Sequence, residues 1–300
     1  MCIRDRTNVG AGSGDIKLQW YGGRGLWLGG WASSAQQNVI DYITISTLGN
    51  ATDFGDLTVA RHWTASCSSV VRGVSGGGSG GYLNVMDYIT IATTGNAIDF
   101  GDLTHSTSGC DAVSDATKGV FAGGYHPPAS NIIDYVIMAT TGNAVDFGDM
   151  VQAGSNAACE DGTRGLFGGG NRTGVSNAID YITISTPGNA IDFGDLTVAR
   201  SSLAATSSGT RGVWGGGSTS NDTLDYVTIA TPGNAVDFGN LATGGANLGA
   251  CGDAIKGLWG GGRSYTNIIE YITIATTGNA VDFGDLTLGR HGVTGSCSGD

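Results

Sequence analysis

Residues 178–196 read A-I-D-Y-I-T-I-S-T-P-G-N-A-I-D-F-G-D-L, and five further versions of this string occur in the chain. Its tyrosine recurs at spacings of 45 to 47 residues, as Tyr42, Tyr88, Tyr135, Tyr181, Tyr226 and Tyr271. A fixed period of this size is the signature of a repeat architecture. The repeat as a whole, rather than any single motif, therefore decides the fold.

Each repeat contains four segments with strand character. In chain order they are a small-residue segment (for example 64–69), an apolar string ending in glycines (for example 165–170), the I-D-Y-I-T-I segment and the D-F-G-D segment. Four strands in about 46 residues are typical of a propeller blade. The sequence predicts an all-β fold, with residues 7–300 forming a single six-bladed β-propeller. Residues 1–6 match no repeat and are interpreted as a non-native segment.

The third strand of each repeat is apolar on both faces. Because successive side chains alternate, Ile40 and Tyr42 point to one side and Ile43 and Ile45 to the other. Such a strand is covered on both sides, so the blades must stack. We expect the six tyrosines to be largely buried between blades, with Phe54 and its equivalents nearby.

A turn signal separates the third and fourth strands. It reads T-T-G-N in most copies and T-P-G-N at Pro187 and Pro232. Pro at the second position and Gly at the third are typical of a type II turn. The sequence therefore predicts a hairpin turn at this string.

The repeat unit resembles a kelch repeat. The features that carry the resemblance are the glycine pair Gly216–Gly217, the following Tyr226, the aromatic Phe238 and an arginine after the fourth strand, present as Arg61, Arg200 and Arg290. Kelch repeats usually have Trp where all six copies here have Phe, so the set is a divergent, kelch-like one. The T-T-G-N-A-V-D-F-G-D-L-T string also resembles repeats in virion structural proteins of marine tailed phages.

Two alternatives remain open for closure of the ring. Six copies of the second to fourth strands are present, whereas the first-strand segment occurs seven times if 9–15 is matched to 294–300. In one alternative, residues 292–298 complete the first blade beside the 25–30 strand. In the other, the chain is a fragment of a seven-bladed or longer array.

The composition is rich in glycine and acidic. The chain has 54 glycines, 14 Lys and Arg against 26 Asp and Glu, and a net charge of −12. It lacks the basic footprint that nucleic acid requires, so we expect no nucleic-acid partner. No apolar run approaches the ~18 residues of a membrane span, so we expect no membrane insertion. An extracellular or virion-associated location is favoured, and the oligomeric state stays open.

Cysteines and repeated aspartates are the candidate metal ligands. Cys67, Cys159 and Cys251 each lie six residues before the glycine of the next strand, and no C-x-x-C pair exists. We expect small buried thiols on the innermost strand rather than zinc ligands. Asp-Phe-Gly occurs six times, which fits turn capping and solubility, with Ca²⁺ as the alternative because it prefers oxygen ligands. We otherwise expect no metal and no cofactor.

The repeats differ from one another mainly in two connections. These are the loop after the glycine string and the link from the fourth strand to the next first strand, and alternating strand directions place both at one end of a blade. They collect bulky side chains of types common in binding surfaces. The candidate ligand-binding residues are Trp31, His62, Trp63, Tyr82, Tyr125, His126, Arg172, Arg263 and Tyr265.

These residues favour a non-catalytic binding or structural module. Aromatic rings beside Asn, Ser and Arg suit the faces and hydroxyls of a glycan, and their spread over several blades predicts shallow subsites. A protein surface ligand, as for an interaction scaffold, is an alternative. A propeller enzyme acting on glycans is another, sialidase-like with an arginine triad or galactose-oxidase-like with a copper site, although no catalytic residue is assigned. The plainest interpretation is drift in surface loops.

Overall fold

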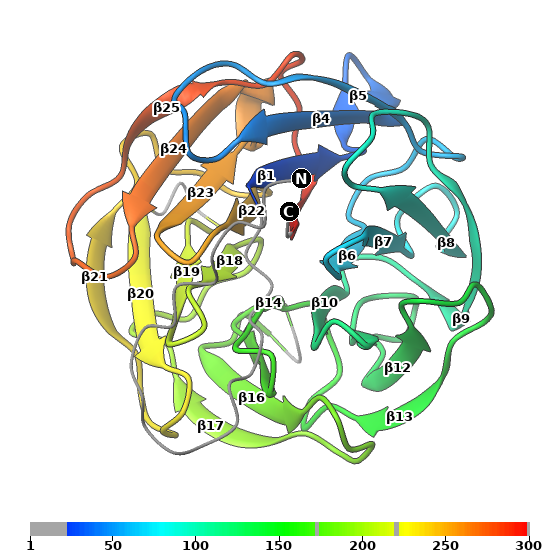
Figure 1. Cartoon of the computed structure of the whole chain (residues 1–300). Helices are drawn as coiled ribbons and strands as arrows, with labels where there is room; N and C mark the ends of the chain where they lie inside the picture. The colour runs from blue at the N-terminus through cyan, green and yellow to red at the C-terminus, as the bar shows by residue number, and fades with distance from the viewer. Residues whose placement is uncertain (1–22, 172–173, 219–221, 299–300) are drawn as a thin grey trace, which may run out of the picture.

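The computed structural model describes residues 23–171, 174–218 and 222–298, which form a ring of six four-stranded blades (Figure 1). All neighbouring strands within a blade are antiparallel, and the small-residue strand lies innermost. The all-β, six-bladed propeller predicted from the repeat is confirmed. Residues 1–6 and 9–15, which the sequence singled out, lie outside the described residues.

The first three blades follow one order from the inner to the outer strand. Blade 1 consists of β26 (Thr294–Ser298), β1 (Arg24–Leu28), β4 (Val39–Thr44) and β5 (Thr52–Asp56). Blade 2 consists of β6 (Ala65–Ser68), β7 (Arg72–Gly76), β8 (Leu83–Thr90) and β9 (Ile98–Thr107). Blade 3 consists of β10 (Asp111–Ser114), β11 (Lys118–Ala122), β12 (Ile132–Ile137) and β13 (Val145–Asp149).

The other three blades are built in the same way. Blade 4 consists of β14 (Ala157–Glu160), β15 (Arg164–Gly168), β16 (Ala178–Thr183) and β17 (Ile191–Asp195). Blade 5 consists of β18 (Ala204–Ser207), β19 (Arg211–Gly215), β20 (Thr223–Thr228) and β21 (Val236–Asn240). Blade 6 consists of β22 (Gly249–Gly252), β23 (Lys256–Gly260), β24 (Ile268–Thr273) and β25 (Val281–Asp285). Outside the blades lie a small hairpin, β2 (Trp31–Ala32) and β3 (Ala35–Gln36), and the 3-10 helix η1 (Arg263–Tyr265).

Blade 1 combines strands from both ends of the chain. β26 pairs antiparallel with β1, with Thr294 opposite Leu28 and Ser298 opposite Arg24. Figure 1 shows this C-terminal strand near the centre of the ring beside β1. The prediction that residues 292–298 supply the missing inner strand is confirmed, and the ring closes with six blades.

The T-P-G-N string is not the turn that the sequence predicts. The corner lies earlier, at Ile184 and Ser185, where the Thr186 amide donates to the Thr183 carbonyl at 3.1 Å. The following Pro187–Gly188 pair lies outside the turn. The type II assignment was wrong because these residues meet a partner in the preceding blade, which the local pattern does not reveal.

That partner is the outer strand of the neighbouring blade. The Ala190 amide donates to the Asp149 carbonyl at 2.8 Å, and the Asp149 amide donates to Asn189 Oδ1 at 3.0 Å. The same asparagine contact recurs at all six blade junctions, through Asn50, Asn96, Asn143, Asn189, Asn234 and Asn279. Each outer strand would otherwise expose unpaired backbone groups, so this contact also protects the sheet edges.

The glycine of Asp-Phe-Gly is required by this contact. A Cβ on Gly148 would lie 2.5 Å from the Gly188 carbonyl oxygen, and the φ of Gly148 is +150°. The glycines at the other five junctions have φ between +141° and +151° and face an equally close carbonyl. Asp-Phe-Gly is therefore a packing motif in this protein.

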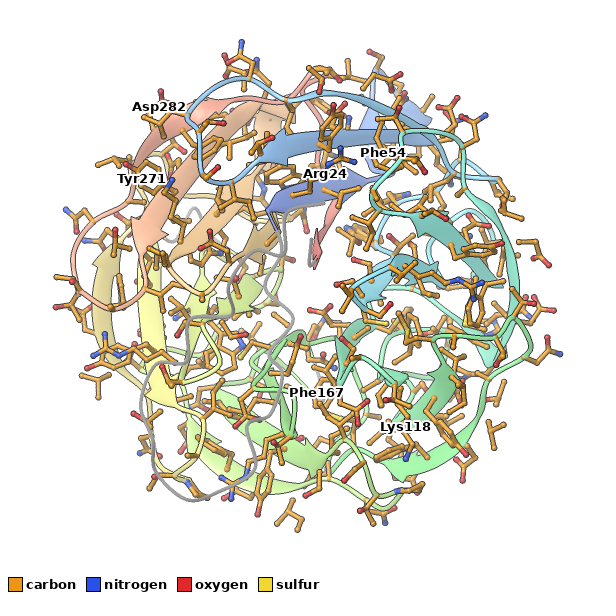
Figure 2. The ribbon with its side chains drawn as sticks, viewed as in Figure 1. Arg24, Phe54, Lys118, Phe167, Tyr271 and Asp282 are labelled. Atoms are coloured by element: carbon orange, nitrogen blue, oxygen red, sulfur yellow. The ribbon has the colours of Figure 1, made fainter. Side chains whose placement is uncertain are left out.

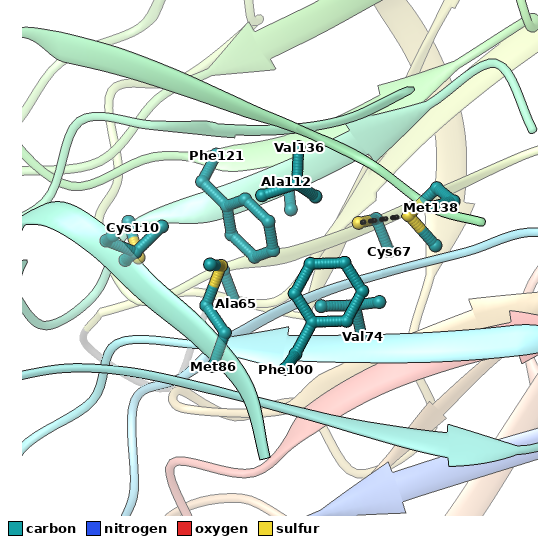
Figure 3. Packing of buried hydrophobic residues seen from close by; sticks show 11 residues of the cluster. Ala65, Cys67, Val74, Met86, Phe100, Cys110, Ala112, Phe121, Val136 and Met138 are labelled. Carbon is teal, nitrogen blue, oxygen red and sulfur yellow. Dashed lines mark hydrogen bonds between the residues drawn. The ribbon is translucent and has the colours of Figure 1, made fainter. Parts of the chain in front are cut away.

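The core lies between adjacent blades. Figure 3 shows one cluster, in which Phe100 and Met86 of blade 2 pack with Phe121 and Val136 of blade 3. Similar clusters lie at the other junctions. The prediction that the third strand is covered on both faces is confirmed.

The six tyrosines lie between blades and are partly buried, each packed against the hydrophobic cluster of its junction, as the sequence predicts. Tyr88 sets its ring edge to face against Phe100, with centroids 6.0 Å apart. The Arg72 guanidinium lies over the same tyrosine at 4.6 Å and donates to the Met138 carbonyl of the next blade. A cation covers the tyrosine in every blade, as Arg24, Arg72, Lys118, Arg164, Arg211 and Lys256. The aliphatic stem and the charge of this cation cover the part of each ring that the packed blades leave exposed.

Glycines of the second strand make room for aromatic rings of the next blade. A Cβ on Gly168 would lie 2.7 Å from the Trp214 ring, and the Trp214 indole donates to the Ala157 carbonyl of blade 4 at 2.9 Å. Gly215 receives Trp259 in the same way. A glycine on one blade opposite a large ring on the next keeps the junction closely packed.

The I-D-Y aspartate is a buried acceptor at the blade junction. Asp225 accepts from Arg200 at 2.6 Å and from the Thr197 hydroxyl at 2.5 Å. Equivalent ion pairs join Arg61 to Asp87 and Arg290 to Asp41. At the junction of blades 5 and 6 the acid is Glu270, which accepts from the Thr243 amide at 2.7 Å. The three arginines that carry the kelch resemblance are thus buried structural groups.

We predict that two glycines of one contact respond differently to substitution. Gly148→Ala places a methyl group against the Gly188 carbonyl at an unfavourable φ, and should cost more than about 3 kcal/mol of unfolding free energy. Gly188→Ala places its methyl group in open space and should change stability by less than about 1 kcal/mol. Urea unfolding of both variants measures the difference, and equal losses would contradict the docking role of the outer strand.

Candidate ligand-binding site at the axial mouth

The two variable connections meet at one end of the ring, as their topology predicts. The Ser79 amide donates to the His62 carbonyl at 2.7 Å, and Ser108 and Tyr125 exchange backbone hydrogen bonds. Corresponding contacts join the two connections at the other blades. The structure therefore holds the loops of all six blades in one rim around the axis.

One group of candidate residues gathers where blades 6, 1 and 2 meet. The His62 ring lies 5.2 Å from the Trp31 ring and 4.5 Å from the Trp63 ring. Tyr265 approaches His291 at 5.2 Å, and His291 pairs through its backbone with Trp31. His291 is a member of this group that the sequence analysis did not select. Burial and the neighbouring His291 lower the pKa of His62 to about 4, so its imidazole is neutral near pH 7.

A second group lies on blades 2 and 3. Tyr82 stacks on His126 at 4.8 Å and lies 6.2 Å from Tyr125. Arg263 is exposed on η1 and contributes to neither ring cluster, while Arg172 lies outside the described residues. The predicted residues therefore form two aromatic groups on one rim.

Several of these aromatic residues have an unfavourable backbone conformation. Trp63, Tyr82 and Tyr265 have φ values of 54°, 57° and 57°. At the position of Trp63, two other repeats carry Gly109 and Gly292, with φ values of 65° and 63°. A bulky residue in this left-handed region costs about 1–2 kcal/mol. The rim thus has large rings at left-handed positions where the other repeats have small residues, such as Gly109, Ser202 and Asn247.

A cavity of about 460 Å³ lies on the axis inside this rim. All six innermost strands contribute to its wall, and Trp63, Tyr82 and Tyr125 stand at its mouth. Serine, threonine and asparagine supply much of the lining, and no described lining residue is Lys, Arg or His. The cavity is therefore polar, with aromatic rings at its entrance and carboxylates as its charged groups.

Those carboxylates are Asp111 and Glu160, which the sequence analysis missed. Asp111 accepts from the amides of Ala112 at 2.9 Å and Ala158 at 2.7 Å. Burial raises the pKa of Asp111 to about 7 and that of Glu160 to about 8, the latter helped by the negative charges of Asp111 and Asp161. Comparison of the repeats could have found them, because these are the acidic residues that the described inner strands contain.

The thiols lie where the sequence predicts. Cys67, Cys159 and Cys251 are buried on β6, β14 and β22, and Cys110 is buried directly before β10. The side chains of Cys2 and Cys297 lie outside the described part of the chain. Burial raises the pKa of the Cys110 thiol to about 12.

The residues considered for other chemistry lie apart from the cavity. Asp282 of the Asp-Phe-Gly set is at the outer margin of the ring (Figure 2), and its equivalents are likewise on outer strands. Within the described ranges, no three His, Cys, Asp or Glu side chains are placed to hold a metal ion. Arg61, Arg200 and Arg290, the arginines of the sialidase alternative, are enclosed between blades and do not line the cavity.

No protein-family model matches the chain, and no curated protein shows significant similarity to it. In the described part of the structure, no helix is long and apolar enough to cross a bilayer. A propeller fold of this kind is consistent with a binding or scaffold module.

We predict a pH-dependent stability difference that reports on Glu160. Its raised pKa means that the folded protein retains a proton that the unfolded chain loses above about pH 4.5, so stability falls between pH 4.5 and pH 8. Glu160→Gln removes this titration, and its stability relative to wild type should rise by about 2–4 kcal/mol from pH 5 to pH 8. Urea unfolding at both pH values measures this, with Asp282→Asn as an exposed control. Parallel pH dependence in wild type and Glu160→Gln would show that Glu160 is not desolvated.

Proposed function

We propose that this protein is a non-catalytic binding module that takes a glycan at the axial mouth. The observation that carries the proposal is the presence of aromatic residues at strained rim positions. Trp63 stands in a left-handed conformation where two other repeats have glycine and two have the small Ser202 and Asn247, and it is 41% exposed at the cavity entrance. Strained residues that folding does not require gather at functional sites.

The chemistry of the rim suits a sugar. Tyr125 is 49% exposed and, with Tyr82, offers apolar ring surface beside the polar wall of the cavity. Rigid aromatic residues supply contact area at low entropic cost, and hydroxyl and amide groups supply adaptable hydrogen bonds. Asn171 and Asn247 are among the amides that line the same entrance.

The non-catalytic part of the proposal rests on the residues around the axis. A glycan-active enzyme would bring His, Arg, Tyr and carboxylates together there, whereas the described cavity lining holds tyrosines and carboxylates without His or Arg. The kelch-like repeat pattern and the resemblance to phage virion repeats support a displayed surface module. Weak binding at each site would then be strengthened by display of many copies.

We predict that Trp63→Gly separates binding from folding. Glycine suits the left-handed backbone, so the melting temperature should change by less than about 4 °C, corresponding to less than about 1 kcal/mol. Affinity for a glycan found on an array should fall at least about tenfold, the equivalent of about 1.4 kcal/mol. Ile255→Ala, at an exposed turn on the opposite end of the ring, is the control and should bind normally.

A second variant tests the rim as a whole. Replacement of Tyr125 and Tyr265 together by Ala should abolish glycan binding and leave the fold intact, because both side chains are about half exposed. Glycan-array binding and thermal melting are the two measurements. Unchanged binding by a folded double variant would favour drift in surface loops.

A further inference from the structure

The axial cavity, called the lumen from here on, has two carboxylates in its wall, Asp111 and Glu160. Neither has an ion-pair partner among the described residues. Asp111 accepts two backbone amides, whereas Glu160 has no neighbouring cation in the described cavity wall. The six cations at the start of the second strands lie against tyrosine rings instead. A carboxylate withdrawn from water without a cation is unfavourable, so a cationic ligand would relieve a cost that the fold leaves in place.

The two carboxylates lie at different depths in the lumen. Asp111 is the first residue of β10 and pairs with Ala122, directly before the rim glycines of blade 3. Glu160 is the last residue of β14 and pairs with Gly165, at the far end of its strand. A ligand that meets both must extend along the axis from the rim.

An independent observation also indicates a ligand in this lumen. Ser207 on β18 is 7% exposed and lines the cavity, and its hydroxyl is not among the fully buried side-chain atoms that lack a partner, so this hydroxyl is open to the cavity. It is the last residue of its strand, as Glu160 is of the neighbouring strand. A hydroxyl that opens onto a polar cavity and is not used by the protein can donate to or accept from a molecule that enters the cavity.

We propose that the lumen selects an amino-sugar oligosaccharide, with its first sugar rings at the aromatic rim and protonated amines at successive depths directed toward Asp111 and Glu160. This inference rests on the proposed glycan-binding function and adds the class of sugar. The charge set of the wall excludes an acidic glycan, because an anion would meet Asp111 and Glu160 with no compensating cation from the described lining. The Ser207 hydroxyl lies at the same end of its strand as Glu160 and can accept from the amine that meets Glu160, since the three N–H groups of that amine need several acceptors.

Neighbouring titratable groups influence the pKa values of Asp111 and Glu160. The negative charge of Asp161 acts on Glu160, and the thiols of Cys67, Cys110 and Cys159 lie within electrostatic range of the same carboxylates. Burial raises the pKa of each of these thiols, so they stay neutral at pH 7. A bound cation therefore acts on the two carboxylates and lowers their pKa values, which releases protons.

The test compares trimers of equal length that carry an amine, a neutral acetamide or a carboxylate. Titration calorimetry at pH 7 measures a glucosamine trimer, the matched N-acetylglucosamine trimer and a uronic acid trimer against wild type and the Asp111→Asn/Glu160→Gln double variant. We expect the wild type to bind the amine trimer at least tenfold more tightly than the acetylated one and to reject the acidic one. The double variant should bring the amine and acetylated trimers within twofold of each other, without weakening the acetylated trimer.

A sugar-free probe keeps this inference separate from the proposed function. Binding of 1,4-diaminobutane should release protons in wild type, seen as a dependence of the heat on buffer ionisation, and should disappear in the double variant.

If the acetylated trimer binds and the amine trimer binds no more tightly, the amino-sugar inference is overturned and the glycan module stands. If no sugar binds, the glycan function fails. In that case diaminobutane binding shows a cation-selective lumen alone, and the amino-sugar class is overturned. Tighter binding of a trilysine peptide than of the amine trimer would overturn it as well.

Discussion

The docking of each Gly-Asn-Ala segment on the outer strand of the preceding blade is the contact on which this ring depends. It places a carbonyl, such as that of Gly188, where any side chain on Gly148 would collide. It also pairs the backbone of a strand that would otherwise be a free edge. Both partners of the contact lie within one repeated string. The near identity of the six copies therefore follows from a single packing requirement, met six times around the circle.

Closer to the axis than these outer-strand contacts, side chains of unequal size fit each blade to its neighbour. Gly168 and Gly215 leave space for Trp214 and Trp259, and the smaller ring of Phe167 packs with Ala122. At the junction of blades 1 and 2 the sizes are reversed in the equivalent positions, which hold Leu28 and Ser75, both buried. Since close packing tolerates little change in volume, these combinations favour one order of blades. The buried Arg–Asp pairs add charge complementarity at three of the junctions.

The rim and the lumen are free of these requirements, and there the repeats diverge. Large rings occupy left-handed positions at Trp63 and Tyr265, and acids replace small residues at Asp111 and Glu160. Each of these choices costs stability, through backbone strain or through desolvation of a charge. Their grouping around one axial cavity connects the proposed binding rim with the proposed cation-selective lumen. The uniform strands thus serve as a rigid frame for a variable site.

The sequence by itself determined the blade, its four strands and the end of the ring where the variable loops gather. It could do so because a 46-residue period, apolar faces and alternating strand directions are local properties of one repeat. Only the tertiary structure decided that T-P-G-N docks on a neighbour, that Tyr88 is half-buried beneath Arg72, and that Asp111 and Glu160 share one lumen. These features join residues of different repeats, some of them more than 200 positions apart, as Trp27 and Gly249 are. Their partners exist only once the ring has closed, so no local pattern could contain them.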